Sequence, residues 1–395
     1  MAVKGIFVSD AGALAERPEA FSSVILREAR GYGVPLFALS SGMPNIDCDQ
    51  TMVSWYEEGL LHSRTLITQI ATPTGSTFVI DDASWVTENQ VFMIEASGEY
   101  ILVLGVTGNT LTVQRGIGGT AITPIVLGGD EVAIQLIGAA FEEGSERPTA
   151  IATSPYPRTN ITQIFRHSWD ITGTAKASKY RWGDRKPRNK ATAANRHAEH
   201  IERSLIWGKR HVGVVNNKPY RQMDGLIAQL RTNFMISPAG GLTRRALTDF
   251  IERIFSKNIE GQPNERLFFC GNVSVRALQE IVYRYGDYQI SLRENEFGIK
   301  VQKFVTPFGD ASLMIHPLMN ESPVWSNQIY AFHPGAIEMA WLRRTEHIGE
   351  GQNGQASDLR DAEAGVFTSE LTTKYMLEQT GGVLMDIEVN HYELE

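Results

Sequence analysis

The chain has 395 residues, 42% of them apolar, and a formal net charge of −8, so it can form several structural units, each with its own core. No apolar run is long enough to span a bilayer, and the first residues lack the charged-then-apolar pattern of a signal peptide. The two cysteines, Cys48 and Cys270, have no metal-ligand spacing. Composition therefore disfavours a membrane protein and a disulfide-rich secreted scaffold.

Charge is unevenly distributed along the chain. Residues 40–150 contain 3 Lys or Arg against 14 Asp or Glu, a net of −11, whereas residues 151–235 contain 16 against 5, a net of +11. Two interpretations stay open: two solvated faces of one protein, or a basic arm that meets an acidic surface on another subunit. Sequence-specific nucleic-acid binding is disfavoured, because the basic stretch lacks interleaved aromatic residues and matches no known module.

The first 71 residues give weak signals. Residues 1–47 are typical of an arm with one short helix, which would begin at Pro18, present Phe21 and Ile25 on its apolar side, and end at Gly31. Such a helix is too small to bury itself alone, so we expect it to pack on the domain or on a neighbour. Residues 51–70 are not assigned to either strand or helix.

Residues 72–138 change character, since short alternating segments are separated by turn signals about ten residues apart. The pairs Ser97-Gly98 and Gly108-Asn109 supply the positive φ that tight turns need. This pattern predicts a small all-β domain inserted in the chain. Its expected strands lie near Thr77–Ile80, Gln90–Glu95, Glu99–Val106, Thr110–Arg115 and Glu131–Ile137.

A long strand followed by a long helix is expected between residues 158 and 209. Ile161, Phe165, Trp169 and Ile171 alternate with polar residues, which indicates a strand with one apolar face. After Gly183 the period lengthens to three or four, which predicts an amphipathic helix. Its expected apolar face consists of Ala191, Ala194, Ala198, Ile201 and Leu205. An extended arm joined to such a helix suits a subunit that reaches onto its neighbours.

The remainder of the chain is typical of a mixed α/β domain followed by strands. We expect helices over Thr243–Lys257 and Ser274–Tyr285, and a loop over residues 346–364. The last two strands are expected to form a hairpin around Gly381-Gly382. The predicted strands are Leu267–Cys270, Ile299–Val305, Ala311–His316, Gln328–His333, Ala336–Arg343, Thr368–Leu377 and Val383–Val389.

Motifs that would carry chemistry are weak. His197 and His200 flank Glu199 on the predicted helix, but this arrangement lacks the HExxH pattern of zinc hydrolases, so we expect solvated or interface histidines. Asp81-Asp82 is a poor calcium pair, because adjacent strand residues point to opposite faces. GIGGT at 116–120 is expected to be a turn, and Cys270 a buried core thiol. We therefore expect no catalytic residue, no metal site and no cofactor.

The order of segments resembles the major capsid proteins of tailed bacteriophages, in particular a family in which an extended E-loop precedes a long spine helix. Three later segments continue the likeness: ERLFFCGNVSVRALQEIV, FGIKVQKFVTPFGDASLMIHPLM and SNQIYAFHPGAIEMAWLR. The first part of the resemblance rests on Asn160, Gln163, Trp169, Thr174, Tyr180, Gly183, Glu199, Ile201, Glu202 and Arg203.

The resemblance implies an α+β, HK97-like (Johnson) capsid fold with a β-rich insertion in the E-loop. The implied divisions are an N-terminal arm (1–47), the E-loop and its arms (48–71 and 139–183), the inserted β domain (72–138), the spine helix and peripheral domain (184–240), the axial domain (241–335), and a return to the peripheral domain with C-terminal strands (336–395).

The resemblance also implies a function. The protein would be a non-enzymatic subunit that self-assembles as pentamers and hexamers into an icosahedral virion shell enclosing double-stranded DNA, after assembly in the host cytoplasm. A decoration or scaffolding protein is a further partner that stays open. The implied inter-subunit contacts are Arg158, Phe165, Arg166, Trp169 and Lys179. The alternatives are an encapsulin-like compartment shell, and a carbohydrate-binding or enzymatic protein that uses the inserted β domain.

Overall fold

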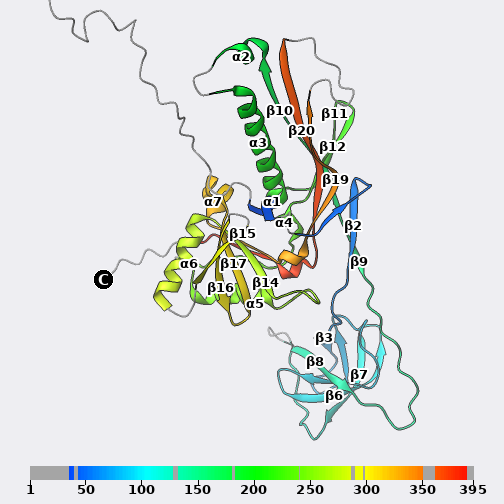
Figure 1. Cartoon of the computed structure of the whole chain (residues 1–395). Helices are drawn as coiled ribbons and strands as arrows, with labels where there is room; N and C mark the ends of the chain where they lie inside the picture. Colours follow the sequence, from blue (N-terminus) through cyan, green and yellow to red (C-terminus); the bar gives the residue numbers. More distant parts are fainter. Residues whose placement is uncertain are drawn as a thin grey trace, which may run out of the picture. The chain divides into compact units, whose positions relative to one another are not determined.

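The computed structural model describes residues 35–39, 43–127, 132–179, 183–239, 241–285, 290–296, 299–349 and 361–388. The chain forms two compact units (Figure 1). Tyr56–Arg158 is called the barrel unit here, and Met1–Trp55 with Thr159–Glu395 is called the main unit. The predicted helix beginning at Pro18 lies outside the described residues.

The barrel unit is a closed ring of six antiparallel strands. Its interior is apolar because every second strand residue points inward, and Phe78, Phe92 and Ile101 are fully buried there. Gly98 and Gly108 adopt positive φ in the turns, as expected. The strands are β3 (Arg64–Ile70), β4 (Thr77–Ile80), β5 (Gln90–Ile94), β6 (Glu99–Thr107), β7 (Thr110–Ile117) and β8 (Val132–Ala139), closed in the order β3-β4-β7-β6-β5-β8.

The predicted start of the β domain at residue 72 is too late by one strand. β3 hydrogen-bonds to β4 and to β8, so it closes the barrel. The unassigned stretch 51–70 contains β3 and also β2 (Met52–Glu57), which pairs with β9 (Tyr156–Ile161) in a two-stranded ribbon. The sequence pattern missed β3 because the apolar Leu66 lies on its outward side and the polar Thr65 on its buried side, which breaks a clean alternation.

The first sheet of the main unit has the order β1-β19-β20-β10. The long helix α3 (Arg185–Trp207) lies along β10 and β20 (Figure 1). The Asp184 side chain caps this helix by accepting a hydrogen bond from the Lys186 N–H. The other elements are β1 (Asn45–Asp47), β10 (Gln163–Thr172), α2 (Gly173–Ala177), β19 (Ile337–Gly349) and β20 (Ala362–Tyr375).

The buried face of α3 is partly the expected one. Ile201 and Leu205 are fully buried, but Ala191 is exposed. Ala193 and His197 are buried instead. The side that faces the core repeats with the helical period, and the small alanines do not reveal which side that is. In the first half of the helix, the apolar face was therefore predicted on the wrong side of the helix axis.

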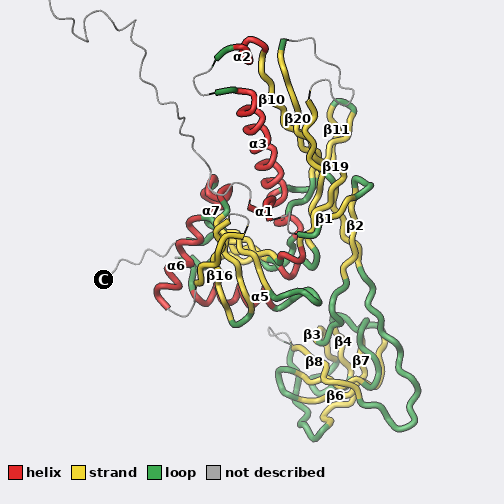
Figure 2. The backbone as a smooth tube through the Cα atoms, viewed as in Figure 1, coloured by secondary structure: helices red, strands yellow, loops and turns green. Residues whose placement is uncertain are grey.

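The second sheet of the main unit has seven strands in the order β13-β21-β18-β14-β17-β16-β15. Figure 2 labels its strand β16, with the helices α5 and α6 nearby. Phe250 and Ile254 of α5 (Arg244–Phe255) pack with Phe268 in its core. α6 (Asn272–Tyr285) matches the helix that was predicted over Ser274–Tyr285. The strands are β13 (Phe234–Ile236), β14 (Glu265–Cys270), β15 (Ile290–Glu296), β16 (Ile299–Thr306), β17 (Gly309–Ile315), β18 (Ile329–Phe332) and β21 (Gly382–Met385).

The expected C-terminal hairpin is wrong. β20 pairs with β10 and β19 in the first sheet, whereas β21 pairs with β13 and β18 in the second. Gly382 is needed for close packing instead of chain reversal, since a Cβ there would lie 2.9 Å from the Asn233 carbonyl oxygen. β19 also extends to Gly349, inside the stretch that was expected to be a loop.

Candidate inter-subunit surface

Two of the five expected contact residues belong to the chain's own core. Phe165 is 5% exposed and Trp169 is 7% exposed. The Trp169 Nε1–H donates to His347 Nε2 at 2.9 Å, and the two rings stack with centroids 5.9 Å apart. Their alternation indicated a buried strand face correctly, but the face packs inside the subunit. These side chains therefore pack mainly within the subunit, and their expected contact with a neighbour stays a prediction.

The three charged candidates differ in their surroundings. The half-buried Arg158 guanidinium lies 3.5 Å from the Glu57 carboxylate and over the Tyr156 ring, so it has partners within the barrel unit. Arg166 on β10 and Lys179 after α2 are exposed. Only the last two therefore present their charge freely to solvent at the surface.

Three histidines join α3 to β10. His167 Nδ1 lies 3.1 Å from His197 Nδ1, and His167 Nε2 lies 3.1 Å from His200 Nδ1. His197 Nε2 lies 2.6 Å from the Ser369 hydroxyl of β20. Burial, together with the charge of the other two histidines, lowers the pKa of His197 to about 4. His197 is therefore a neutral internal link, not the solvated histidine that the sequence suggested.

The α3 residue Glu202 is a second internal link that sequence analysis missed. Its carboxylate is fully buried, accepts hydrogen bonds from the N–H groups of Leu36 and Phe37 at 2.8 and 2.7 Å, and lies 2.8 Å from His316 Nε2. It thereby fixes α1 (Pro35–Leu39) against α3. The available signal was its spacing, because Glu202 stands four residues after Ala198 and three before Leu205, on the predicted apolar face of the helix.

An exposed apolar hairpin follows α3. β11 (His211–Val215) and β12 (Lys218–Gln222) form a separate two-stranded sheet. Val212, Val214 and Val215 are 59%, 70% and 56% exposed. The sequence analysis missed this hairpin, although Asn216-Asn217, both at positive φ, is a tight-turn signal.

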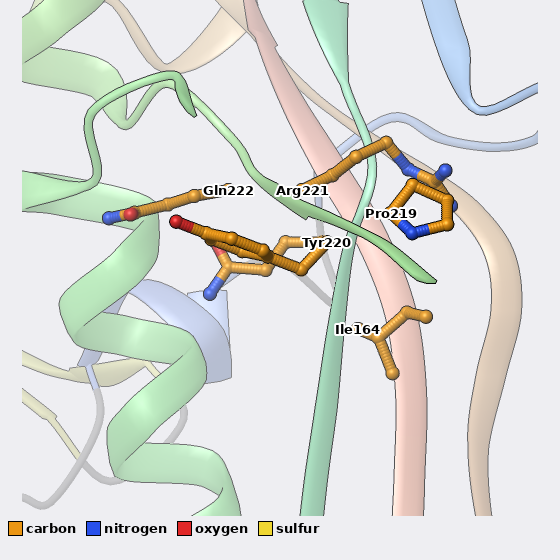
Figure 3. A pocket seen from close by; sticks show the side chains of 6 residues that line it. Ile164, Pro219, Tyr220, Arg221 and Gln222 are labelled. Carbon is orange, nitrogen blue, oxygen red and sulfur yellow. The ribbon is translucent and has the colours of Figure 1, made fainter. Parts of the chain in front are cut away.

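Two shallow hollows flank the β10 residues Gln163 and Ile164, beside the hairpin. The first has a volume of about 300 Å³ and lies under the Tyr220 ring (Figure 3). The second, of about 450 Å³, lies between β10 and α3. Ile164 is 47% exposed between them, so the apolar surface of the hairpin continues across β10. The first hollow is lined by Gln163, Ile164, Pro219, Tyr220, Arg221 and Gln222, and the second by Gln163, Ile164, Phe165, Arg166, His167, His200, Arg203 and Ser204.

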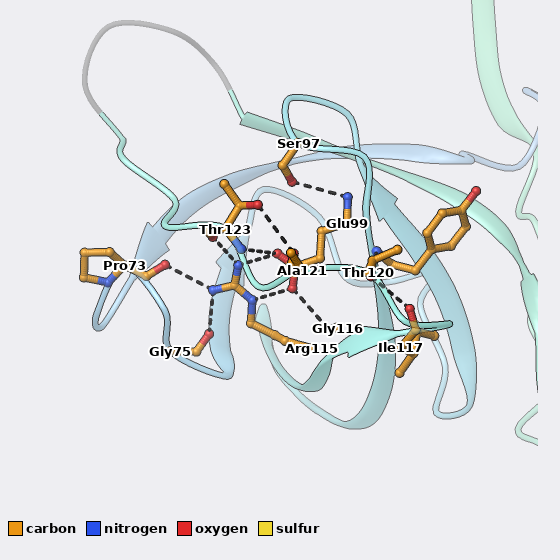
Figure 4. Close-up of polar contacts among 11 residues, drawn as sticks. Pro73, Gly75, Ser97, Glu99, Arg115, Gly116, Ile117, Thr120, Ala121 and Thr123 are labelled. Carbon is orange, nitrogen blue, oxygen red and sulfur yellow. Dashed lines mark hydrogen bonds and ion pairs between the residues drawn. The ribbon is translucent and has the colours of Figure 1, made fainter.

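A buried ion pair holds the long β7–β8 connection of the barrel (Figure 4). Arg115 donates to both Glu99 carboxylate oxygens at 2.9 and 2.6 Å and to the Pro73 carbonyl at 3.1 Å. Glu99 also accepts from the N–H groups of Gly116 and Thr123. Hydrogen bonds from Arg115 lower the pKa of Glu99 although burial opposes this. Within GIGGT, Gly118 and Gly119 form the expected turn, whereas Gly116 and Ile117 still belong to β7, and the Gly116 N–H is held by Glu99.

Within the described part of the chain, no group of three or more His, Cys, Asp or Glu side chains could hold a metal ion. Cys270 is fully buried, and desolvation raises the pKa of its thiol, so it stays protonated as the sequence suggested. No described helix is long and apolar enough to cross a membrane.

Comparisons with known proteins agree with the segment order. The model of a family described as SU10 major capsid protein matches residues 19–388. The major capsid protein of Pseudomonas phage PaMx41 is 25% identical over 390 residues, which cover 94% of this chain and 92% of that protein. The capsid structure of the Cyanophage P-SCSP1u has a TM-score of 0.50 at 9% identity, covers 98% of this chain and 96% of that chain, and shows a shared fold. An encapsulin complex from Synechococcus elongatus PCC 7942 covers 62% of this chain and 81% of its own, with a TM-score of 0.45 and 12% identity.

Proposed function

This chain belongs to the SU10 major capsid protein family, and from that premise we propose how its parts build a shell. It is a structural subunit of a tailed-phage capsid and has the HK97-like fold. Subunits of this kind self-assemble into a shell, so the protein is a virion component. The match over residues 19–388 is the observation that carries this conclusion, because it spans nearly the whole chain.

The finer assignment of parts is our proposal. We assign residues 1–47 to an N-terminal arm, and the β2–β9 ribbon with β10 to the arms of an E-loop. The barrel unit is its insertion, with the boundary moved upstream to include β3. α3 acts as the spine of a peripheral domain that includes β19 and β20. Residues 241–335, with most of the second sheet, form the axial domain.

We further propose that the subunits gather as pentamers and hexamers that enclose double-stranded DNA without reading its sequence, after assembly in the host cytoplasm. The role is mechanical, without catalysis. Arg166 and Lys179 act in contacts between subunits, since both are exposed on the basic stretch 151–235. Many weak contacts repeated over a closed symmetric assembly are sufficient to hold a shell.

The test is assembly of the purified full-length chain. We expect capsomers or closed particles in analytical ultracentrifugation and electron micrographs, without an added cofactor. Charge reversal at Arg166 or Lys179 should lower the particle yield more than the melting temperature of the unassembled subunit. Raising salt should slow early association, because attraction between solvated charges is screened over about 10 Å at 0.1 M. A chain that stays monomeric at high concentration and turns over a small substrate would contradict the proposal.

A further inference from the structure

The β11–β12 hairpin gathers four exposed apolar side chains, Val212, Val214, Val215 and Tyr220. Val212 and Val214 lie on one face of the ribbon, because alternate strand residues share a face, and their cross-strand neighbours are Arg221 and Pro219. Tyr220 lies on the other face against Gly213, where a Cβ would clash with its ring at 2.4 Å. Both faces of this small sheet thus present apolar groups to solvent.

Physical chemistry makes such a ribbon unstable in isolation. A two-stranded hairpin is marginal in water unless one face is packed, and exposed contiguous apolar surface usually marks an interaction site. The base of this hairpin is held by Arg221, whose guanidinium lies 3.4 Å from the Glu370 carboxylate. Its outer end, with Val214 and Val215, has no such cover among the described residues. A second molecule would bury the surface that the chain itself leaves open.

The charge of the hairpin indicates which kind of second molecule it can bind. Residues 209–222 contain four Lys or Arg and no Asp or Glu, so two copies of the hairpin placed face to face would repel each other. The same chain has a strongly acidic stretch, residues 40–150, with a net charge of −11. A basic, apolar hairpin on one copy and an acidic stretch on another are complementary, and they form a heterologous contact, which can close into rings.

We propose that the β11–β12 hairpin, together with the adjoining hollow at Ile164, is a docking surface for the acidic stretch of a second copy of this chain. The proposal rests on the shell function proposed above and names a partner surface for it. The valines supply apolar burial, and the exposed Lys218 orients the acidic partner. Ile164, Pro219 and Tyr220 line the adjoining hollow (Figure 3). Arg166, one of the expected contacts, lines the neighbouring hollow.

Site-specific photo-crosslinking tests the contact directly. A benzophenone amino acid at Val214 in the full-length chain should crosslink, in assembled particles, to a peptide from residues 40–150 of another copy. The matched control is the same group at Val324, which is 61% exposed, close to the 70% of Val214, but lies on α7 (Pro323–Ser326). Crosslinks from Val214 that stay within one chain, reach other residues, or do not exceed those of the control would overturn the proposal.

A variant pair separates this inference from the shell function. The double variant V212T/V214T keeps the shape and β propensity of the hairpin but adds hydroxyls that lose water on docking. We expect about a tenfold loss of particle yield with an unchanged subunit melt, and no loss for Val324→Thr. If wild type assembles and the double variant assembles equally well, the docking surface is wrong while the shell function stands. If wild type itself does not assemble, the shell function fails first.

Discussion

The barrel unit and the main unit complete their sheets in opposite ways. In the barrel all six strands are hydrogen-bonded in a closed ring, which removes free edges. The first sheet of the main unit instead ends at β10 and at the three-residue β1, and the apolar β11–β12 hairpin is exposed nearby. A closed barrel is stable by itself, whereas open edges and bare apolar groups favour association. This difference is the reason that we propose assembly contacts on the main unit and treat the barrel unit as an insertion.

Buried polar groups differ between the two units as well. The barrel contains a complete ion pair, Arg115 with Glu99, whose side chains are 2% and 0% exposed. The main unit links its elements through Glu202 with His316 and through His197 with His167. The His197 link responds to mild acid, because burial lowers the pKa of His197 to about 4, whereas the arginine–carboxylate pair persists until the carboxylate is protonated.

The largest effect should come from a charge in the core of the main unit. Ile201→Asp places a carboxylate at a fully buried position of α3, so we expect a loss on the order of 4 kcal/mol of unfolding free energy. Glu199→Ala, on the neighbouring turn, should cost only about 0.3 kcal/mol. Arg203, on the same helix, pairs with Glu321 at 2.7 Å. Similar urea midpoints for the two variants would show that the helix face is misassigned.

Breaking the buried ion pair of the barrel should lower the unfolding free energy nearly as much, but only in that unit. Arg115→Leu leaves the Glu99 carboxylate buried without its partner, which should cost about 3–5 kcal/mol. Arg64→Leu is the matched control, because it breaks the solvent-exposed pair with Glu95 and should cost far less stability. Calorimetry should show the barrel transition moving while that of the main unit stays. A joint shift of both transitions would break the comparison between the units.

Mild acid should weaken the main unit. The folded pKa of His197 is about 4, against 6.5 for an ordinary histidine, so between these values the unfolded chain binds a proton that the folded chain does not. Stability is therefore complete above about pH 6.5 and falls towards pH 4, by up to roughly 3 kcal/mol. His167 and His200 face the same cluster, and Arg196 lowers the pKa of His167 further.

The measurement is a series of urea melts from pH 7 to 4.5. His197→Gln should flatten the slope, because the titrating ring is gone. His333 contributes to the pH dependence of stability with the same sign, because burial and the charge of Arg266 lower its pKa to about 4. His333→Asn should therefore remove a separate, additive part of the slope. An unchanged slope in the His197 variant would assign the pH dependence to other groups.

The smallest effect on the main unit should come from removing the barrel. Replacing residues 62–140 by a short Gly/Ser linker removes all six strands and should change the main unit's stability by less than about 1 kcal/mol. Replacing only residues 72–138 would leave β3 without its partners β4 and β8 and should cause aggregation. If both deletions behave alike, or if the larger one unfolds the main unit, the two units are not independent.

Local patterns predicted much of this molecule correctly. The helices at α5 and α6 and the strands β4 to β7 lie close to their expected ranges, because turn residues and periodicity act over a few positions. The order of segments was enough to recognise a capsid family. The predicted boundary was wrong where the sequence pattern was weak, as at β3. The predicted buried face was wrong where the apolar content was low, as at Ala191 of α3.

The sequence by itself determined that Phe165, Trp169 and Ile171 of β10 share a face, since alternation is a property of the strand, although the single strand expected from Ile161 is divided there into β9 and β10. Only the tertiary structure decided what covers that face: Phe165 and Trp169 pack within their own subunit, and Val212 and Val214 do not. Likewise Gly381-Gly382 has the composition of a turn, but long-range pairing places β20 and β21 in different sheets. Burial and pairing depend on partners far along the chain, so local patterns do not contain that information.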